Sequence, residues 1–143
     1  MNGAPLVTTG SYPAAIACHL TDPSVVNKID YSDPIMKTQI RVTEQMNHKF
    51  ITDIKDKSIV GYKYFDFRNV SKIQLEIRGK FKGTIEIAHS ENGAAIGSQK
   101  VNLSSNSWAL IDIPVKAKSG TQALYFRFTG SGRADFKTFA FLR

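Results

Sequence analysis

Two aromatic residues stand where a protein could stack a sugar ring. Trp108 is the only tryptophan and follows the polar run Ser104-Ser105-Asn106-Ser107, while Tyr62 follows Gly61. An aromatic ring offers a large apolar face at low entropic cost, and junctions between loops and strands commonly carry binding residues. Trp108 and Tyr62 are therefore our candidate binding residues, and packing in the core is the alternative for each.

Hydrolytic chemistry on a sugar would need two carboxylates roughly 5–10 Å apart. If the segment Gly79–Gly83 forms a symmetric hairpin, Glu76 lies opposite Glu86, with the Cβ atoms about 5 Å apart. We interpret this pair as solvated surface charge, because Arg78 is close enough to neutralise it. No nucleophile elbow, zinc-binding helix motif or phosphate-binding glycine loop accompanies the pair. The sequence therefore favours a protein that is not an enzyme.

The remaining reactive side chains are scattered. His19, His48 and His89 lie far apart and lack the spacing of metal ligands. Cys18 is the single cysteine, which excludes an internal disulfide, and its apolar neighbours indicate a buried, inert thiol. We expect neither a metal centre nor a cysteine nucleophile from these residues.

The elements that would position the aromatic candidates are β-strands. Ile73, Leu75 and Ile77 alternate with polar residues, which is the period of a half-buried strand. Further strands are predicted at 13–20, 64–67, 84–89, 95–103, 108–115, 122–128 and 135–142, with turns at 79–83, 91–93 and 129–132. We interpret residues 21–40 as a long irregular excursion and 41–57 as strand or short turn. About eight strands with almost no helix predict an all-β sandwich of the jelly-roll type.

The composition limits which kinds of molecule the chain could bind. The 143 residues suit one domain with a single core, and the net charge is +7. Because the Lys and Arg residues are scattered rather than clustered, the charge argues against nucleic acid and favours a solvated basic surface suited to acidic polysaccharides. No apolar run is long enough to cross a membrane, and the opening residues do not resemble a signal peptide.

Four stretches carry a family resemblance: GYKYFDF, KIQLEIRGKFKGTIEI, SWALIDIPV and QALYFRFTGSGRADFKTFAF. Together they resemble a family 6 carbohydrate-binding module, in the version found at the C-terminus of bacterial family 43 glycoside hydrolases that act on xylan or arabinan. The resemblance is strongest over 59–142 and weaker over 21–50. It implies that residues 1–12 are a lead-in from a missing catalytic domain and that 13–143 are the module.

For the fold and the site, the resemblance implies a galactose-binding-like jelly roll without catalytic activity. Its sugar lies between a tyrosine and a tryptophan beside an asparagine, which correspond here to Tyr62, Trp108 and Asp135. The family often has a second tryptophan that this chain lacks. An aspartate at position 135 accepts hydrogen bonds from sugar hydroxyls but donates none when it is ionised.

The same resemblance implies a structural calcium ion, but this chain departs from the pattern. Lys137 occupies the place of a family aspartate, and a lysine adds repulsion and no oxygen ligand. Glu44 is the candidate for the other ligand, a glutamate. We expect calcium to be absent or bound elsewhere, and no other cofactor.

The expected function is recognition of a plant cell-wall polysaccharide, either xylan or an arabinose-containing chain, for an attached glycoside hydrolase. The alternative is a structural module that docks on its own N-terminal catalytic domain and binds no sugar. The expected location is extracellular or periplasmic, as part of a longer bacterial protein, with no nucleic-acid or membrane partner.

Overall fold

The computed structural model describes residues 6–8, 10–17, 19–21, 40–45 and 48–142. Cys18 and nearly all of the predicted excursion at 21–40 lie outside these residues. The described residues form one sheet of nine strands. Its elements are β1 (Leu6–Val7), β2 (Ser11–Pro13), the 3-10 helix η1 (Ala14–Ile16), β3 (His19–Thr21), β4 (Arg41–Gln45), β5 (His48–Ile54), β6 (Ser58–Phe67), β7 (Lys72–Ala88), β8 (Ala95–Pro114) and β9 (Gly120–Leu142).

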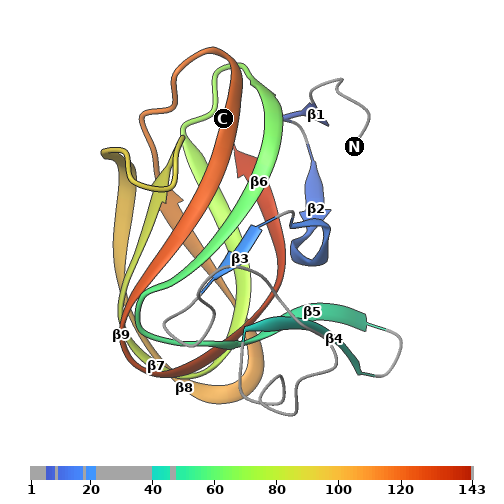
Figure 1. Cartoon of the computed structure of the whole chain (residues 1–143), viewed down its shortest axis with the longest axis vertical. Helices are drawn as coiled ribbons and strands as arrows, with labels where there is room; N and C mark the ends of the chain where they lie inside the picture. The colour runs from blue at the N-terminus through green and yellow to red at the C-terminus, as the bar shows by residue number, and fades with distance from the viewer. Residues whose placement is uncertain (1–5, 9, 18, 22–39, 46–47, 143) are drawn as a thin grey trace.

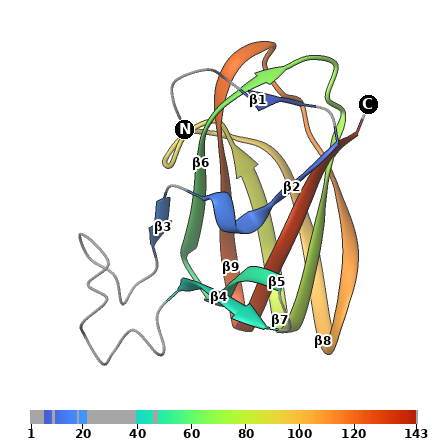
Figure 2. The ribbon, with the colours of Figure 1, turned by 90° about the vertical axis from the view of Figure 1, so that its right-hand side faces the viewer.

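Strand β9 is the strand on which most of the sheet assembles. One edge pairs antiparallel with β7 along its whole length, from Ala88↔Tyr125 to Lys72↔Leu142. The other edge pairs with β6, then β5, then β2. Figures 1 and 2 show the long strands curling around the molecule, with the short β4–β5 hairpin at its lower end. The curled sheet of long antiparallel strands confirms the predicted all-β jelly-roll architecture.

The predicted turns at 79–83 and 129–132 are wrong, because both stretches lie inside long strands. Gly83 pairs with Gly130, and Phe81 pairs with Gly132, in the middle of the β7–β9 ladder. A side chain on Gly83 would overlap the carbonyl oxygen of Thr129, so the two backbones approach each other more closely than side chains allow. The glycines bend the paired strands together instead of reversing the chain.

One consequence of this bend concerns the two glutamates. Because β7 runs unbroken through the glycine segment, Glu76 and Glu86 lie ten positions apart on one strand and do not face each other. Their partners on β9 are Thr138 and Arg127, respectively. The carboxylate pair that a symmetric hairpin would have created does not exist.

Two other local predictions needed correction or refinement. The predicted strand at 13–20 is interrupted by η1 and resumes only at β3, which pairs with β6. The uncertain region 41–57 contains two strands, β4 and β5, that pair antiparallel. This hairpin matters for function, because it brings Phe50 and Thr52 beside β9.

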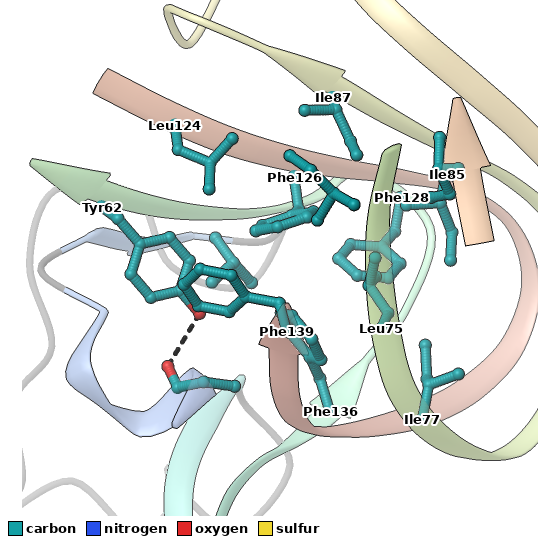
Figure 3. Close-up of a cluster of buried hydrophobic side chains, with 14 of the residues drawn as sticks. Tyr62, Leu75, Ile77, Ile85, Ile87, Leu124, Phe126, Phe128, Phe136 and Phe139 are labelled. Atoms are coloured by element: carbon teal, nitrogen blue, oxygen red, sulfur yellow. Dashed lines mark hydrogen bonds between the residues drawn. The ribbon is translucent and has the colours of Figure 1, made fainter. Parts of the chain in front are cut away.

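The core inside the curled sheet is rich in phenylalanine. Phe126 packs at 5.2 Å from Phe136 and at 5.5 Å from Phe139, measured between ring centroids. Figure 3 shows these rings with Leu75, Ile77, Ile85 and Ile87 between the strands. Inclined ring pairs of this kind add stability beyond the apolar area that they bury. The core therefore fixes the strands that carry the surface described below.

The lead-in segment takes part in the fold. Strand β1 pairs parallel with β6, and β2 pairs with β9. The ring of Tyr12 lies 5.4 Å from that of Phe65, and its hydroxyl donates to the carbonyl oxygen of Val7 at 2.6 Å. That this segment leads in from a catalytic domain remains a prediction. Among the described residues, no helix has the length and apolar character needed to span a membrane.

The bend in β9 gives a test of stability. Gly132 has φ of 94°, and an added Cβ would overlap the carbonyl oxygen of Lys80, whereas Gly120 has φ of 96° and open space around it. We expect Gly132→Ala to lower the free energy of unfolding by about 3 kcal/mol or more, and Gly120→Ala by about 1–2 kcal/mol. Urea unfolding measures both values, and equal losses would contradict a close approach of β7 and β9.

Candidate functional site

Five neighbouring strands place a cluster of polar and aromatic side chains on the outer face of the sheet. Arg78 on β7 pairs directly with Asp135 on β9. On the far side of β9, Ile51 of β5 pairs with Phe136, which brings Phe50 alongside. On the far side of β7, Ile77 pairs with Ala109, next to Trp108 of β8. Residues distant in sequence thus meet through strand register alone.

Arg78 is at the centre of this cluster. Its guanidinium carbon lies 4.4 Å from the ring centroid of Trp108 and 4.9 Å from that of Phe50. Its Nε donates to Asp135 Oδ2, and its Nη2 donates to Gln45 Oε1, both at 2.9 Å. A guanidinium beside aromatic rings contributes about 0.5–2 kcal/mol, depending on desolvation. Arg78 therefore ties the two rings to the acidic and amide groups around them.

The rings of Phe50 and Trp108 meet edge to face and form a corner; they do not lie parallel with a gap between them. The ring centroids of Phe50 and Trp108 are 5.4 Å apart, with 74° between the planes. Phe50 is only 4% exposed, whereas Trp108 is half-buried. Trp108 is therefore the aromatic residue of the cluster that retains a larger surface toward solvent.

Asp135 is held by two donors. Thr52 Oγ1 donates to Asp135 Oδ1 at 2.6 Å, while Arg78 binds the other carboxylate oxygen. The Asp135 side chain keeps 22% of its surface exposed. Hydrogen bonds to both oxygens favour one fixed orientation of the carboxylate.

A second cation lies close to the same tryptophan ring. Lys137 Nζ is 5.2 Å from the Trp108 ring centroid and 3.8 Å from Glu76 Oε1. Thr138 Oγ1 donates to the same oxygen of Glu76 at 3.2 Å. Trp108 is thus flanked by Arg78 and Lys137, each of which is paired with a carboxylate.

The position of Trp108 depends on an irregularity in β8. Gly79 pairs with Ser105 and Ile77 pairs with Ala109, so three β8 residues lie opposite Arg78 alone. A bulge of this kind bends a strand and redirects its side chains. The run at 104–107, which we predicted to be a loop, is therefore an irregular part of β8, and it still determines where Trp108 lies.

Tyr62 is not part of this surface, and its predicted place in a binding cleft is wrong. It is 2% exposed, and its ring centroid lies 4.7 Å from that of Phe139. Its hydroxyl donates to the carbonyl oxygen of Ala14 at 2.8 Å, as Figure 3 shows by the dashed line. Gly61 lies within β6, covered by the ring of Tyr125, and does not form a loop. Tyr62 has the core role that the sequence left open.

Sequence reasoning missed Phe50 and Arg78. Phe50 and Thr52 alternate with Ile51, which is fully buried, so the three residues carry the strand pattern that could have revealed them. Arg78 ends a clear alternating strand, but we interpreted it only as a neutralising charge. Their contacts with Trp108 follow from the register of strand pairing, and the local sequence around either residue does not predict them.

A metal centre finds little support in the described residues. No group of three or more His, Cys, Asp and Glu side chains among them is arranged to hold an ion. Glu44 is exposed on β4 and pairs across the hairpin with Lys49. The expectation about calcium remains a prediction.

Comparison with curated proteins finds a relative along nearly the whole chain. The chain is 32% identical over 141 residues to a xylosidase/arabinosidase from Thermoclostridium stercorarium. The match covers 94% of this chain but only 30% of the relative. The chain thus spans under a third of that enzyme. No family model matches the chain.

Solved structures identify the fold. A family 6 carbohydrate-binding module from Clostridium stercorarium, in complex with cellobiose, matches with a TM-score of 0.77 at 15% identity, covering 99% of this chain and 98% of that one. A β-1,3-glucan-binding family 6 module from Bacillus halodurans has a TM-score of 0.76 at 20% identity, covering 98% and 100%. A family 43 arabinoxylan arabinofuranohydrolase from Bacillus subtilis has a TM-score of 0.75 at 16% identity, covering 98% of this chain and 28% of the enzyme.

These comparisons confirm the jelly-roll fold and the resemblance to family 6 carbohydrate-binding modules. The chain matches modules that are named for binding and not for catalysis. It also matches part of a family 43 glycoside hydrolase.

The core position of Tyr62 can be tested by removing one oxygen. Tyr62→Phe keeps the ring but leaves the carbonyl oxygen of Ala14 without this donor. We expect the free energy of unfolding to fall by about 1–2 kcal/mol, the usual cost of a lost buried hydrogen bond. Tyr64→Phe is the matched control, because Tyr64 is 47% exposed on the same strand and should cost little. Both free energies of unfolding are measured by urea unfolding. Equal decreases in the two variants would contradict a buried hydrogen bond at Tyr62.

Proposed function

We propose that this chain is a non-catalytic accessory module that binds plant cell-wall polysaccharide for an attached glycoside hydrolase. The proposed ligand is a xylan or an arabinose-containing chain. Support comes from the relative, a xylosidase/arabinosidase that is 32% identical over 141 residues. The observation that carries the proposal is the half-buried ring of Trp108 on the outer face, surrounded by polar side chains fixed in position.

The chemistry of the cluster suits a sugar. The C–H face of a pyranose ring packs against an aromatic ring, and a few fixed polar groups then orient the hydroxyls. Trp108 supplies the ring, while Asp135 and Gln45 supply acceptors and Lys137 supplies a donor. Because these groups already contact one another across paired strands, little ordering is required on binding. A single partly exposed ring nevertheless supports only a weak site.

The proposal implies partners and a location. A polysaccharide of the cell wall is too large to enter a cell, so the full protein would act outside the cytoplasm, in the extracellular medium or the periplasm. The other part of the protein would supply catalysis, since this chain corresponds to only 30% of its relative. The module would hold that catalytic domain close to the polymer and raise its effective concentration there.

A second function is supported by the way the corner is filled. Phe50 and Trp108 contact each other edge to face, and Arg78 packs against both rings, so these two residues do not form an open two-ring cleft. Large apolar side chains are exposed away from the cluster, with Val7 at 58% and Tyr64 at 47%, and Leu110, which pairs with Glu76 at the border of the cluster, is 64% exposed. A filled corner and apolar surface elsewhere fit a module that docks on its own catalytic domain and binds no sugar.

Affinity electrophoresis in gels that contain xylan, arabinan or β-glucan tests the two functions. We expect xylan or arabinan to retard the wild-type chain and Trp108→Ala to remove at least about 80% of the retardation, because a lost stacking ring costs about 1 kcal/mol or more. Leu110→Ala is the matched control, since Leu110 is a 64% exposed apolar residue on the same strand. Tyr62→Phe should migrate as the wild type does.

Each outcome decides between the functions. Retardation that survives Trp108→Ala but is lost in Leu110→Ala would move the binding surface along β8. Unretarded migration in all three gels would contradict the binding function and favour docking on the catalytic domain.

A further inference from the structure

The two cations beside Trp108 retain hydrogen-bonding capacity. A guanidinium carries five N–H donors. Arg78 uses one donor on Asp135 and one on Gln45, and its other donors find no acceptor within the described part of the chain. Lys137 lies 3.8 Å from its carboxylate partner, which is longer than a hydrogen bond. Both side chains are 21% exposed, so an external acceptor can reach them.

The neighbouring carboxylates are already engaged by other donors. Asp135 accepts from Thr52 as well as from Arg78, and Glu76 accepts from Thr138. Among the described residues, neither carboxylate accepts a hydrogen bond from the donors that remain on Arg78 and Lys137. A ligand that brings its own oxygen atoms, rather than further donors, would complete the cluster.

The surroundings of the cluster carry more positive charge. Lys80 and Arg133 face each other across the β7–β9 ladder, two positions along from Arg78 and Asp135. Because side chains alternate along a strand, these cations lie on the same face as Arg78. The chain as a whole carries a net charge of +7. Arg133 also pairs with Asp53 at 3.2 Å, so Lys80 is the main added cation near Arg78. Together with the net charge, it favours anionic ligands over a range of about one Debye length, roughly 10 Å at 0.1 M salt.

We propose that the Trp108 cluster recognises an acidic sugar, a uronic-acid residue carried on the polysaccharide. The carboxylate binds between Arg78 and Lys137, and the sugar ring packs against Trp108. This inference rests on the proposed binding function and specifies the charge class of its ligand.

The filled corner explains why an acidic sugar fits better than a neutral one. A neutral ring that entered the corner would displace Arg78 from two aromatic rings and two hydrogen bonds. A carboxylate instead binds the donors that Arg78 still presents, with the side chain left in place. Arginine is suited to this role, because its planar N–H groups match the geometry of a carboxylate.

Two oligosaccharides that differ in a single group test the proposal. The first is a xylo-oligosaccharide with one glucuronic-acid branch, and the second is the same molecule with that carboxyl group reduced to an alcohol. By isothermal titration calorimetry at low salt, we expect the acidic ligand to bind about tenfold more tightly, since two charge-assisted contacts are gained. The advantage should shrink as salt is raised.

Single-residue variants distinguish a defined contact between the ligand carboxylate and a cation from attraction by the net charge of the protein. Lys137→Gln and Arg78→Gln should each lose at least about fivefold in affinity for the acidic ligand and much less for its reduced form. Lys72→Gln removes the same charge from an exposed position at the start of β7 and is the matched control. Urea unfolding of each variant shows whether the fold is retained, and Lys137→Gln carries the test if Arg78→Gln does not fold.

The possible failures are distinguishable. Equal affinity for both ligands, lost in Trp108→Ala, would overturn the acidic-sugar inference and leave the binding function intact. Equal losses in Lys137→Gln and Lys72→Gln would overturn it as well, because net charge alone would then explain the preference. Binding of neither ligand would contradict both the inference and the proposed function.

Discussion

The close approach of β7 and β9 at their glycines is the constraint on which the rest of the structure depends. Where Gly83 meets Gly130 the two backbones come too close for side chains, and the paired strands bend together. That bend curls one sheet over a core rich in phenylalanine and isoleucine side chains. Arg78 and Asp135 lie beside the bend, next to Gly79 and Ala134. The curvature that encloses the core therefore also places the central ion pair of the surface cluster.

The cluster depends on register more than on any loop. Its members come from β4, β5, β9, β7 and β8, and each strand is positioned by backbone pairing with the next. Sites built on paired strands are held more firmly than sites on loops. Trp108 differs, because it lies in the irregular part of β8 and its place depends on the bulge opposite Arg78. Contacts with Phe50, Arg78 and Lys137 then hold its ring.

The alternation of apolar residues was enough to predict the fold class, but glycine patterns were misleading. Ile73, Leu75 and Ile77 are all fully buried, as their period of two predicts. A glycine pair flanking a short polar segment has the same appearance whether it reverses a strand or bends it. Only the partner strand decides between these outcomes, and the partner, β9, lies some fifty residues further along the chain. Local sequence therefore predicted more and shorter strands in this region than the structure contains.

The site was harder to predict than the fold for a related reason. Trp108 is conspicuous as a lone tryptophan beside polar residues, and Asp135 was named through the family resemblance; the structure brings both into one cluster, and their role in binding stays a prediction. Tyr62 was misplaced because a glycine before an aromatic residue was interpreted as the edge of a loop. Its glycine instead makes room for the ring of Tyr125 from the neighbouring strand. Phe50 and Arg78 acquire their roles only through contacts between strands, which no local pattern encodes.

The dependence of the sheet on β9 affects how this chain must fold. Strands β2, β5 and β6 all pair with β9, which is synthesised after each of them. During translation these strands have unpaired edges until the last strand emerges, and such edges promote association between chains. Contacts between residues so distant in sequence also slow folding. The final strand thus completes the domain, and a nascent chain that lacks it is the state most in need of chaperones.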